Sequence, residues 1–468
     1  MALPRLDLHR LTWIFVALGL ALRIWHYLNN HTIWYDEAVL LANILNKDYA
    51  ELLGPLNHAV AAPPIYLWIL KLVSVVCGDQ AYCWRFVSFV CGCATLLLTA
   101  PLVRMVLSPP VAAISVALVA FSDNHIWLTC CIKPYAGDAL IATALLYFYF
   151  ATERWSATRR LTVLTLAIPP ILCTSYSAPF VIGGLLLALL PFAYRERPRG
   201  MAMWCVASLA ALATFACLYF GPIRNQRVEG LVLEWERMYP DLHRPQTLPW
   251  WVVEHTSTIF QFCYMPVGFY LFAVAPLGLL AVWRAGRRDR VILLAAPFLL
   301  AMFAAALKSY PYGFNRLMFF AAPCVLLLGG FGMEVAFQRF PGKRTFLVTA
   351  TLLILISLVV PVSRFFLGWE QPDSSGNAAY IRAHRAQGDI VASDEQTYVY
   401  FFRGELRSLN DIAAANLPAG ARIWVPMDHY NQAMRLEYVT GKLASDRFEL
   451  LETTHFETSC AFLFVKRK

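Results

Sequence analysis

A pair of adjacent carboxylates, Asp36 and Glu37, follows shortly after the first long apolar segment of the chain, at 11–29. A bilayer penalises charge, so an ionisable residue against a membrane is a candidate functional group. Asp36 is suited to act as a general base with Glu37 in support, or to bind a divalent cation through its hard oxygen ligands. Both acids could instead cap a helix that starts near Ala38, because carboxylates favour the positive end of the helix dipole.

Other residues that could contact a substrate lie in the same loop or in later loops between apolar segments. They are basic, acidic and aromatic: Tyr35, His58, Arg85, Lys133, Tyr135, Asp138, Tyr310 and Arg316. A cation among them could hold a phosphate group as a point charge. Taken singly, each also has an ordinary structural interpretation, such as a snorkelling lysine, an aromatic-belt tyrosine or an interfacial arginine.

The composition predicts a polytopic membrane protein. Of 468 residues, 59% are hydrophobic and only 15% are charged, whereas a soluble domain has about 25% charged residues. The net charge of +9 does not indicate nucleic-acid binding, because the Arg and Lys residues fall in short loops, where they act as topology signals. The twelve cysteines show no paired metal-ligand spacing.

About eleven segments are apolar enough to be membrane spans, each of which needs roughly 20 residues. They are 11–29, 84–103, 109–122, 138–152, 161–174, 178–194, 201–220, 262–283, 291–307, 317–334 and 345–362. Every second loop is rich in arginine, which places those loops and the N-terminus in the cytoplasm. The first outer loop, 30–83, holds the acidic pair and a short apolar segment at 64–77. Pro63 and Pro64 could start an interfacial or re-entrant helix there.

Beyond residue 362 the spans stop and the charge rises. Short apolar runs at 389–392 and 422–425 predict strands, 376–386 and 429–441 predict helices, and 448–451 with 461–465 predict a final hairpin. The sequence therefore predicts an all-α transmembrane domain at 1–362, followed by a small α/β domain at 363–468 on the outer face of the membrane.

Several short motifs occur in an order that resembles a known superfamily. They are Trp34-Tyr35-Asp36-Glu37-Ala38, Pro63-Pro64-Ile65-Tyr66, Trp84-Arg85-Phe86-Val87-Ser88, Lys133-Pro134-Tyr135, Ser175-Tyr176-Ser177-Ala178, and Tyr310-Pro311-Tyr312-Gly313 with Arg316. Over roughly residues 1–330 the chain resembles the GT-C superfamily of polyprenyl-phosphate-sugar-dependent glycosyltransferases. The nearest branch is that of the protein O-mannosyltransferases and the lipid A aminoarabinose transferase.

The resemblance implies a large cavity at the outer membrane face, with Asp36 near the acceptor and basic residues near Lys133 and Arg316 holding the donor phosphate. One segment departs from the pattern. Many relatives have an acid or an amide with an arginine where this chain has Cys130-Cys131-Ile132-Lys133. Which residue of that segment touches the substrate is therefore left open.

The residues fit an inverting transfer of a sugar. A polyprenyl phosphate is a good leaving group, so one base suffices for the acceptor and cations stabilise the departing phosphate. An inverting glycosidase, by contrast, needs both an acid and a base. The predicted reaction partners are a polyprenyl-phosphate sugar and a glycolipid, polysaccharide or protein acceptor. The predicted location is a bacterial inner membrane, since no organelle address is visible.

A flippase or transporter of lipid-linked sugars is the alternative function. Its carboxylates would relay protons or bind cations, and its functional charges would lie in the middle of the spans. The centres of the predicted spans are nearly free of charge, and the charged motifs lie in the outer loops. A purely structural scaffold would leave the Asp36–Glu37 pair and Lys133 unexplained. These features favour the transferase.

Overall fold

The computed structural model describes residues 7–227, 233, 235–339, 343–369, 372–428, 432–443, 446–456 and 458–467. Their contacts divide the chain into two compact units. The membrane unit comprises Met1–Asn29 and Ala61–Gly368, and the α/β unit comprises Asn30–Val60 and Trp369–Lys468. The segment 30–60, which the sequence-based division places in the transmembrane domain, is thus grouped with the C-terminal residues.

Seven helices of the described residues are long and apolar enough to cross a membrane, and up to nine spans result if two bent helix pairs each count as one. The seven are Leu8–Leu28 (α1), Ala81–Val106 (α4), Ala178–Arg195 (α9), Arg199–Gln226 (α10 with η2 and α11), Arg288–Ala306 (α15), Arg316–Arg339 (η5 with α16) and Val348–Leu367 in α17. The bent pairs are Pro109–Phe121 (α5) with Asp123–Thr129 (α6), and Pro245–Cys263 (η4 with α13) with Gly268–Arg284 (α14). The chain is therefore an integral membrane protein.

The predicted spans lie on helices, except that 262–283 crosses the break between α13 and α14. Two of the predicted spans fall outside these nine. The predicted spans 138–152 and 161–174 are α7 (Tyr135–Ala151) and α8 (Ala157–Thr174). The first has only 17 residues, and the second carries two arginines near its start. The predicted short helix at 64–77 is α3 (Pro64–Cys77), and it begins at a proline as expected.

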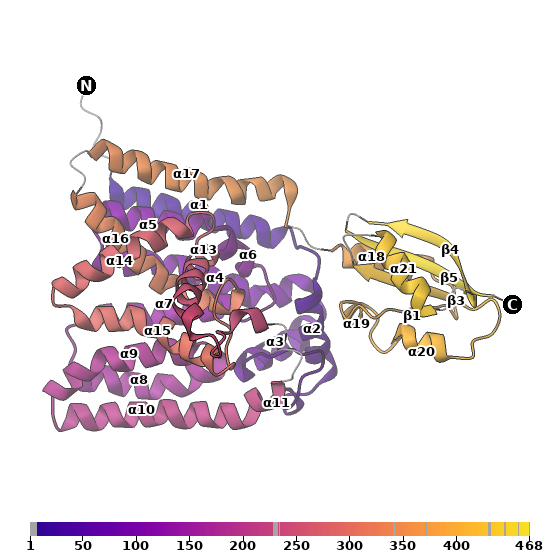
Figure 1. Cartoon of the computed structure of the whole chain (residues 1–468), viewed down its shortest axis with the longest axis horizontal. Helices are drawn as coiled ribbons and strands as arrows, with labels where there is room; N and C mark the ends of the chain where they lie inside the picture. The colour runs from indigo at the N-terminus through magenta and orange to yellow at the C-terminus, as the bar shows by residue number, and fades with distance from the viewer. Residues whose placement is uncertain are drawn as a thin grey trace. The chain divides into compact units, whose positions relative to one another are not determined.

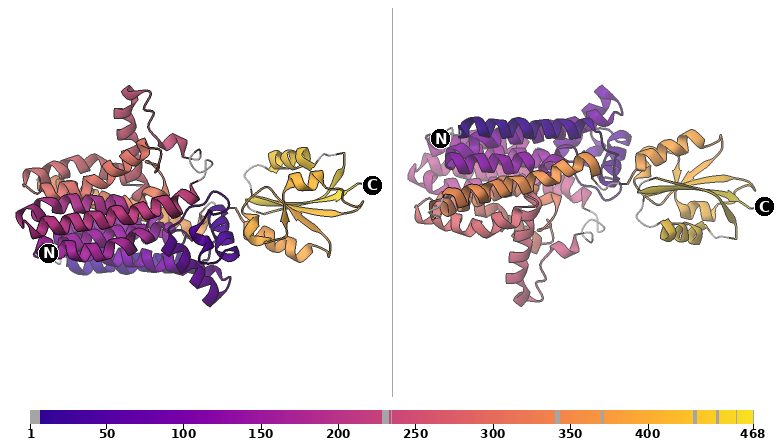
Figure 2. Two further views of the ribbon diagram at one scale, coloured as in Figure 1. Left: turned by 90° about the horizontal axis from the view of Figure 1, so that it is seen from below. Right: turned by 90° about the horizontal axis from the view of Figure 1, so that it is seen from above.

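The long helices of the membrane unit pack side by side as a bundle (Figures 1 and 2). The helix α16 (Ala322–Arg339) lies inside the bundle and is largely buried, whereas α10 (Arg199–Leu218) lies at its edge and is largely exposed (Figure 1). An apolar helix with an exposed surface is what a lipid environment favours. The exposed apolar face of α10 is accordingly suited to contact lipid.

Two glycines allow α14 and α16 to pack closely. A Cβ atom at Gly278 would lie 2.4 Å from the backbone nitrogen of Gly332, and a Cβ at Gly332 would lie 2.2 Å from the carbonyl oxygen of Val274. Small residues commonly permit such close helix packing in membranes. A larger residue at either position would force the two backbones apart.

We expect Gly332→Ala to destabilise the protein by about 1–3 kcal/mol, the usual cost of overpacking. The matched control is Gly441→Ala in α21 (Gln432–Leu443), where an added Cβ meets nothing within 4 Å. That control should leave stability unchanged or raise it slightly. Thermal unfolding of the two variants in detergent would measure the difference, and equal melting temperatures would contradict the packing role of Gly332.

The break between α5 and α6 is stabilised by a buried arginine of α1. Arg23 is fully buried. Its Nη1 donates to the carbonyl oxygen of Ala120 over 3.2 Å, and its Nη2 donates to that of Val119 over 3.0 Å. Carbonyl groups at a helix end lack partners within the helix, and inside a membrane they need another donor. Arg23 supplies that donor at the end of α5.

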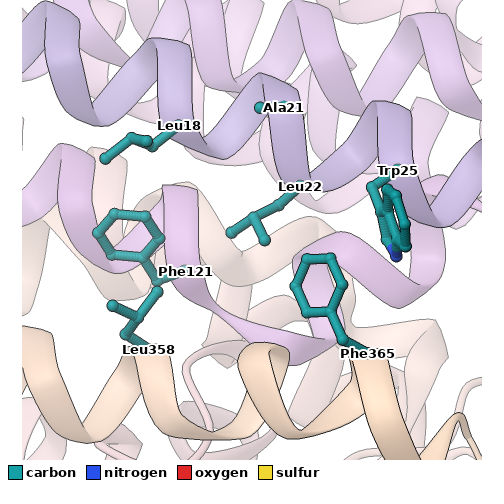
Figure 3. A pocket seen from close by; sticks show the side chains of 7 residues that line it. All are labelled: Leu18, Ala21, Leu22, Trp25, Phe121, Leu358 and Phe365. Atoms are coloured by element: carbon teal, nitrogen blue, oxygen red, sulfur yellow. The ribbon is translucent and has the colours of Figure 1, made fainter.

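An apolar cavity of about 370 Å³ lies between α1, α5 and α17 (Lys343–Leu367). Seven residues line it (Figure 3): Leu18, Ala21, Leu22, Trp25, Phe121, Leu358 and Phe365. Such a lining is suited to hydrocarbon. None of the predicted site residues lines this cavity.

The α/β unit contains a five-stranded mixed sheet with the order β2-β1-β3-β5-β4. The strands are β1 (Ile390–Ala392), β2 (Leu406–Arg407), β3 (Arg422–Asp428), β4 (Phe448–His455) and β5 (Ser459–Lys466). The strand β1 pairs in parallel with β2 and β3, while β5 is antiparallel to β3 and β4. The predicted strands and the final hairpin are therefore confirmed.

Helices cover both faces of this sheet (Figure 2). On one face α18 (Ser374–His384) and α19 (Tyr398–Phe401) pack against Trp424 of β3, and on the other α20 (Leu409–Ala414) and α21 pack against its neighbours Ile423 and Val425. The sequence of a strand that is buried on both faces is a nearly continuous apolar run. For this reason β3 could be predicted. Of the helix predicted at 429–441, residues 429–431 lie outside the described residues and the rest belongs to α21.

Candidate functional site

The predicted site residues fall into both units. Tyr35, Asp36, Glu37 and His58 belong to the α/β unit, and Arg85, Lys133, Tyr135, Asp138, Tyr310 and Arg316 belong to the membrane unit. Contacts within each unit show which of these residues the fold brings together.

The acidic pair lies in the first turn of α2 (Tyr35–Asn46). The helix starts before Ala38, and its N-cap is Trp34, which makes no side-chain capping bond. The interpretation that the acids cap a helix starting near Ala38 is therefore wrong, because the helix starts three residues earlier and the acids lie inside it. Their charges still face the positive end of the helix dipole, which stabilises carboxylates. Asp36 is half-buried, whereas Glu37 is only 1% exposed.

The loop that follows α2 is folded back onto this helix through one asparagine. The amide of Asn43 donates to the carbonyl oxygen of Asn57 over 3.1 Å, and its Oδ1 accepts from the backbone nitrogen of Asn57 over 2.8 Å. The neighbouring His58 adopts a φ of 66°, a region that few residues other than glycine occupy. Burial lowers the pKa of His58 below its usual value, so the imidazole is neutral at pH 7 and brings no permanent positive charge.

In the membrane unit, Tyr135 and Arg316 are in direct contact. The Nε of Arg316 donates to the Tyr135 hydroxyl over 3.1 Å. The guanidinium carbon of Arg316 also lies 6.0 Å from the centroid of the Tyr135 ring and 5.9 Å from that of Trp235, distances at which a cation and a ring attract each other. Arg316 begins the short helix η5 (Arg316–Ala321), whose N-cap Asn315 accepts from the backbone nitrogen of Met318. The arginine is thus held at a fixed helix start.

The segment with Lys133 is attached to α4. The hydroxyl of Ser88 donates to the carbonyl oxygen of Lys133 over 3.1 Å. Arg85 precedes Ser88 by three residues in the same helix, so both residues lie on one face of α4. The side chains of Arg85 and Lys133 are both buried. A buried cation needs a compensating partner, and such partners are the usual reason that cations persist inside a membrane protein.

A second polar cluster surrounds Asp138, in the first turn of α7. Its carboxylate is buried and takes part in hydrogen bonds with the hydroxyls of Ser175 and Ser177. The hydroxyl of Tyr310 donates to the carbonyl oxygen of Leu317 over 2.7 Å. Burial, followed by the nearby Asp138 charge, raises the pKa of Tyr310 well above its usual value. The phenol therefore stays protonated and can serve as a hydrogen-bond donor.

Sequence reasoning missed Gln226, which bonds to Tyr176 in one quoted motif and to Ala62, the residue just before another. Its side-chain oxygen accepts from the backbone nitrogen of Ala62 over 3.1 Å and from the hydroxyl of Tyr176 over 3.2 Å. The residue is 1% exposed and ends the helix that begins with α10. A glutamine shortly after a Gly-Pro pair at the end of a long apolar helix was the available signal, because a polar amide there needs a buried partner.

Within the described ranges there is no group of three or more His, Cys, Asp or Glu side chains that could hold a metal ion. Asp36 and Glu37 carry hard oxygen donors of the kind that Mg²⁺ and Ca²⁺ prefer, and Mg²⁺ commonly completes its shell with water and substrate oxygens.

No protein-family model and no curated protein matches the sequence. Two crystal structures of ArnT from Cupriavidus metallidurans do match the fold. The structure bound to undecaprenyl phosphate has a TM-score of 0.56 at 12% identity, and the apo structure has a TM-score of 0.55 at 10% identity. Each match covers 96% of this chain and 97% of the ArnT chain. The chain therefore has the fold of these ArnT structures, in agreement with the resemblance drawn from its motifs.

Proposed function

We propose that this chain is an inverting glycosyltransferase that moves a sugar from a polyprenyl-phosphate donor to an acceptor at the outer face of the membrane. The acceptor is a glycolipid, a polysaccharide or a protein. The observation that carries the proposal is the match to the ArnT fold over nearly the whole chain, including a structure bound to undecaprenyl phosphate. The acidic pair and the basic residues of the loops support it, because they supply the groups that such a transfer needs.

In the proposed reaction, Asp36 takes the proton from an acceptor hydroxyl or amine. The acceptor atom attacks the anomeric carbon, forming one bond as the bond between that carbon and the phosphate oxygen breaks. The electron pair of the broken bond leaves with the lipid phosphate, and the proton remains on Asp36. A single displacement inverts the configuration at the anomeric carbon. Glu37, buried in the same helix turn, supports the orientation of Asp36.

The cations of the membrane unit have the second role in this proposal. Negative charge grows on the phosphate as the bond breaks, and preorganised positive groups lower the energy of that transition state. Lys133, Arg316 and Arg85 are the candidates. Tyr135 holds Arg316 by accepting a hydrogen bond from its Nε. The Tyr310 hydroxyl already donates to the carbonyl oxygen of Leu317, so it would contact the substrate as a hydrogen-bond acceptor.

The test of the function is sugar transfer by the purified protein in detergent, from a panel of radiolabelled polyprenyl-phosphate sugars. Transfer to an added acceptor, or slow hydrolysis of one donor, would support the proposal and identify the sugar. The expected product has the inverted anomeric configuration. Movement of lipid-linked sugars across vesicle membranes without any transfer would support the flippase instead.

We further expect the α/β unit to lie outside the cytoplasm and the N-terminus inside it, in accordance with the arginine-rich alternate loops. Alkaline phosphatase fused to the C-terminus should be active in bacterial cells, and a green fluorescent protein fused at the same place should not fluoresce. The same pair of reporters at the N-terminus is the control and should give the opposite result. A fluorescent C-terminal fusion would contradict the orientation.

A further inference from the structure

The residues just before Asp36 are bonded to the C-terminal part of the same α/β unit. The hydroxyl of Tyr35 donates to Oε1 of Gln396 over 3.1 Å. The hydroxyls of Thr32 and Ser375 share a hydrogen bond of 3.1 Å. These two contacts join residues that are 361 and 343 positions apart in the chain. The start of α2 and the segment just before it are thereby attached to the C-terminal part of the unit at two points.

Residues close in sequence to both partners, Ser374 and Tyr398, are bonded to one buried carboxylate at the end of β3. Ser374 precedes Ser375, and its hydroxyl donates to Oδ1 of Asp428 over 2.9 Å. Tyr398, two residues after Gln396, donates to the same oxygen over 2.7 Å. Asp428 is only 7% exposed. Hydrogen bonds to a charged and buried acceptor are strong, so the two contact points belong to one rigid frame.

The first turn of α2 depends on such contacts because it has little stability of its own. The helix has 12 residues, and Trp34 at its N-cap makes no side-chain capping hydrogen bond. Isolated helices of this length are marginal in water, and an absent cap weakens the first turn further. Tertiary contacts must therefore set the position of this turn, which carries Asp36 and Glu37.

We propose that the C-terminal residues 369–468 position the catalytic carboxylate, and that Gln396 is the positioning residue through its bond to Tyr35. This inference rests on the proposed function, since it gives Asp36 its catalytic role. Gln396 touches no reacting atom. It acts by holding the residue next to Asp36, and a misplacement of about 1 Å at a reacting group can lower a rate by as much as about 10²-fold.

The test compares two replacements of Gln396, whose side chain is exposed and whose loss should leave the unit folded. Gln396→Met has a similar length but lacks the oxygen acceptor, whereas Gln396→Glu keeps it. The matched control is Tyr380→Phe, which removes the hydroxyl that donates to Glu452 over 2.7 Å elsewhere in the same unit. Two quantities are measured for each full-length variant: kcat and donor KM of sugar transfer, and hydrogen exchange of the α2 amides.

We expect Gln396→Met to lower kcat roughly 5- to 10-fold, the equivalent of one lost hydrogen bond, with donor KM unchanged and faster exchange in the first turn of α2. Gln396→Glu should restore both quantities, and Tyr380→Phe should resemble the wild type. Unchanged exchange and unchanged kcat in Gln396→Met would overturn the positioning role while leaving the transferase intact. No transfer by the wild type would instead overturn the proposed function. The hydrogen bond between Tyr35 and Gln396 would then have no role in catalysis.

Discussion

Asp36→Asn is expected to lower the rate of sugar transfer by about 10²–10⁴-fold, the usual contribution of a positioned general base. Asparagine has nearly the same shape as aspartate and fits the same half-buried place in the first turn of α2. It cannot take the proton of the acceptor. The loss should therefore appear in kcat, with donor binding preserved, and single-turnover transfer from the radiolabelled donor would measure it.

Two further replacements test whether the loss of activity is specific to Asp36. Glu37→Gln should have a smaller effect, because Glu37 is buried and supports Asp36 without touching the acceptor in the proposed reaction. Asp48→Asn is the matched control for the loss of a carboxylate in the same segment. Asp48 is exposed, and its Oδ1 accepts from the backbone nitrogens of Ala50 and Glu51. An Asp36→Asn protein that transfers sugar at the wild-type rate would exclude Asp36 as the base.

The helical part of the fold was largely predictable, whereas the contacts that stabilise the break between α5 and α6 were not. Long apolar windows identify helices in membrane proteins because the bilayer demands them. The break between α5 and α6 falls at Ser122, where the predicted span 109–122 also ends, because the polar residues Asp123, Asn124 and His125 follow. The helix α6 beyond this break was not predicted. What stabilises the break is Arg23, almost a hundred positions earlier in the chain. A window of hydropathy contains no information about such a distant donor.

The α/β unit shows the same division between local and distant information. The strands β1, β3, β4 and β5 were predicted from short apolar runs. The two-residue β2 and the short helices α19 and α20 were not, because they are too short to show a period. That the segment 30–60 belongs with residues after 368 could not be predicted either, since its contacts join residues more than 340 positions apart.

The candidate site residues came from residue type, loop position and family resemblance. These criteria placed Tyr135 and Arg316 among the candidates without relating them to each other. The bond between them joins residues 181 positions apart. Gln226 was missed because its position after the Gly-Pro pair was not used and a single amide has no distinctive spacing of its own. Residue chemistry can thus identify candidate residues of a site. Which of these residues contact each other depends on the tertiary fold.

The other large effect is expected at Arg316. Arg316→Gln should lower kcat/KM for the donor by about 10²–10³-fold, the range found when one preorganised donor to a developing negative charge is removed. Arg316→Lys keeps the charge but loses the planar fork and the Nε that bonds to Tyr135, so it should still lose about tenfold. Transfer rates measured across a range of donor concentrations would separate these losses.

The hydrogen bond between Arg316 and Tyr135 can be tested by a double-mutant cycle. Tyr135→Phe removes the hydroxyl and leaves the charge, and it should cost several-fold by itself, in line with one neutral–charged hydrogen bond. In the Arg316→Gln background the same change should cost almost nothing, because residues in direct contact are not additive.

Arg244→Gln is the control for the loss of an exposed arginine. Arg244 pairs with Asp241 at 3.7 Å, and its replacement should leave transfer unchanged. If Arg316→Gln behaved like Arg244→Gln, the phosphate would have to be held by Lys133 or Arg85, and each would then be replaced by Met in the same assay.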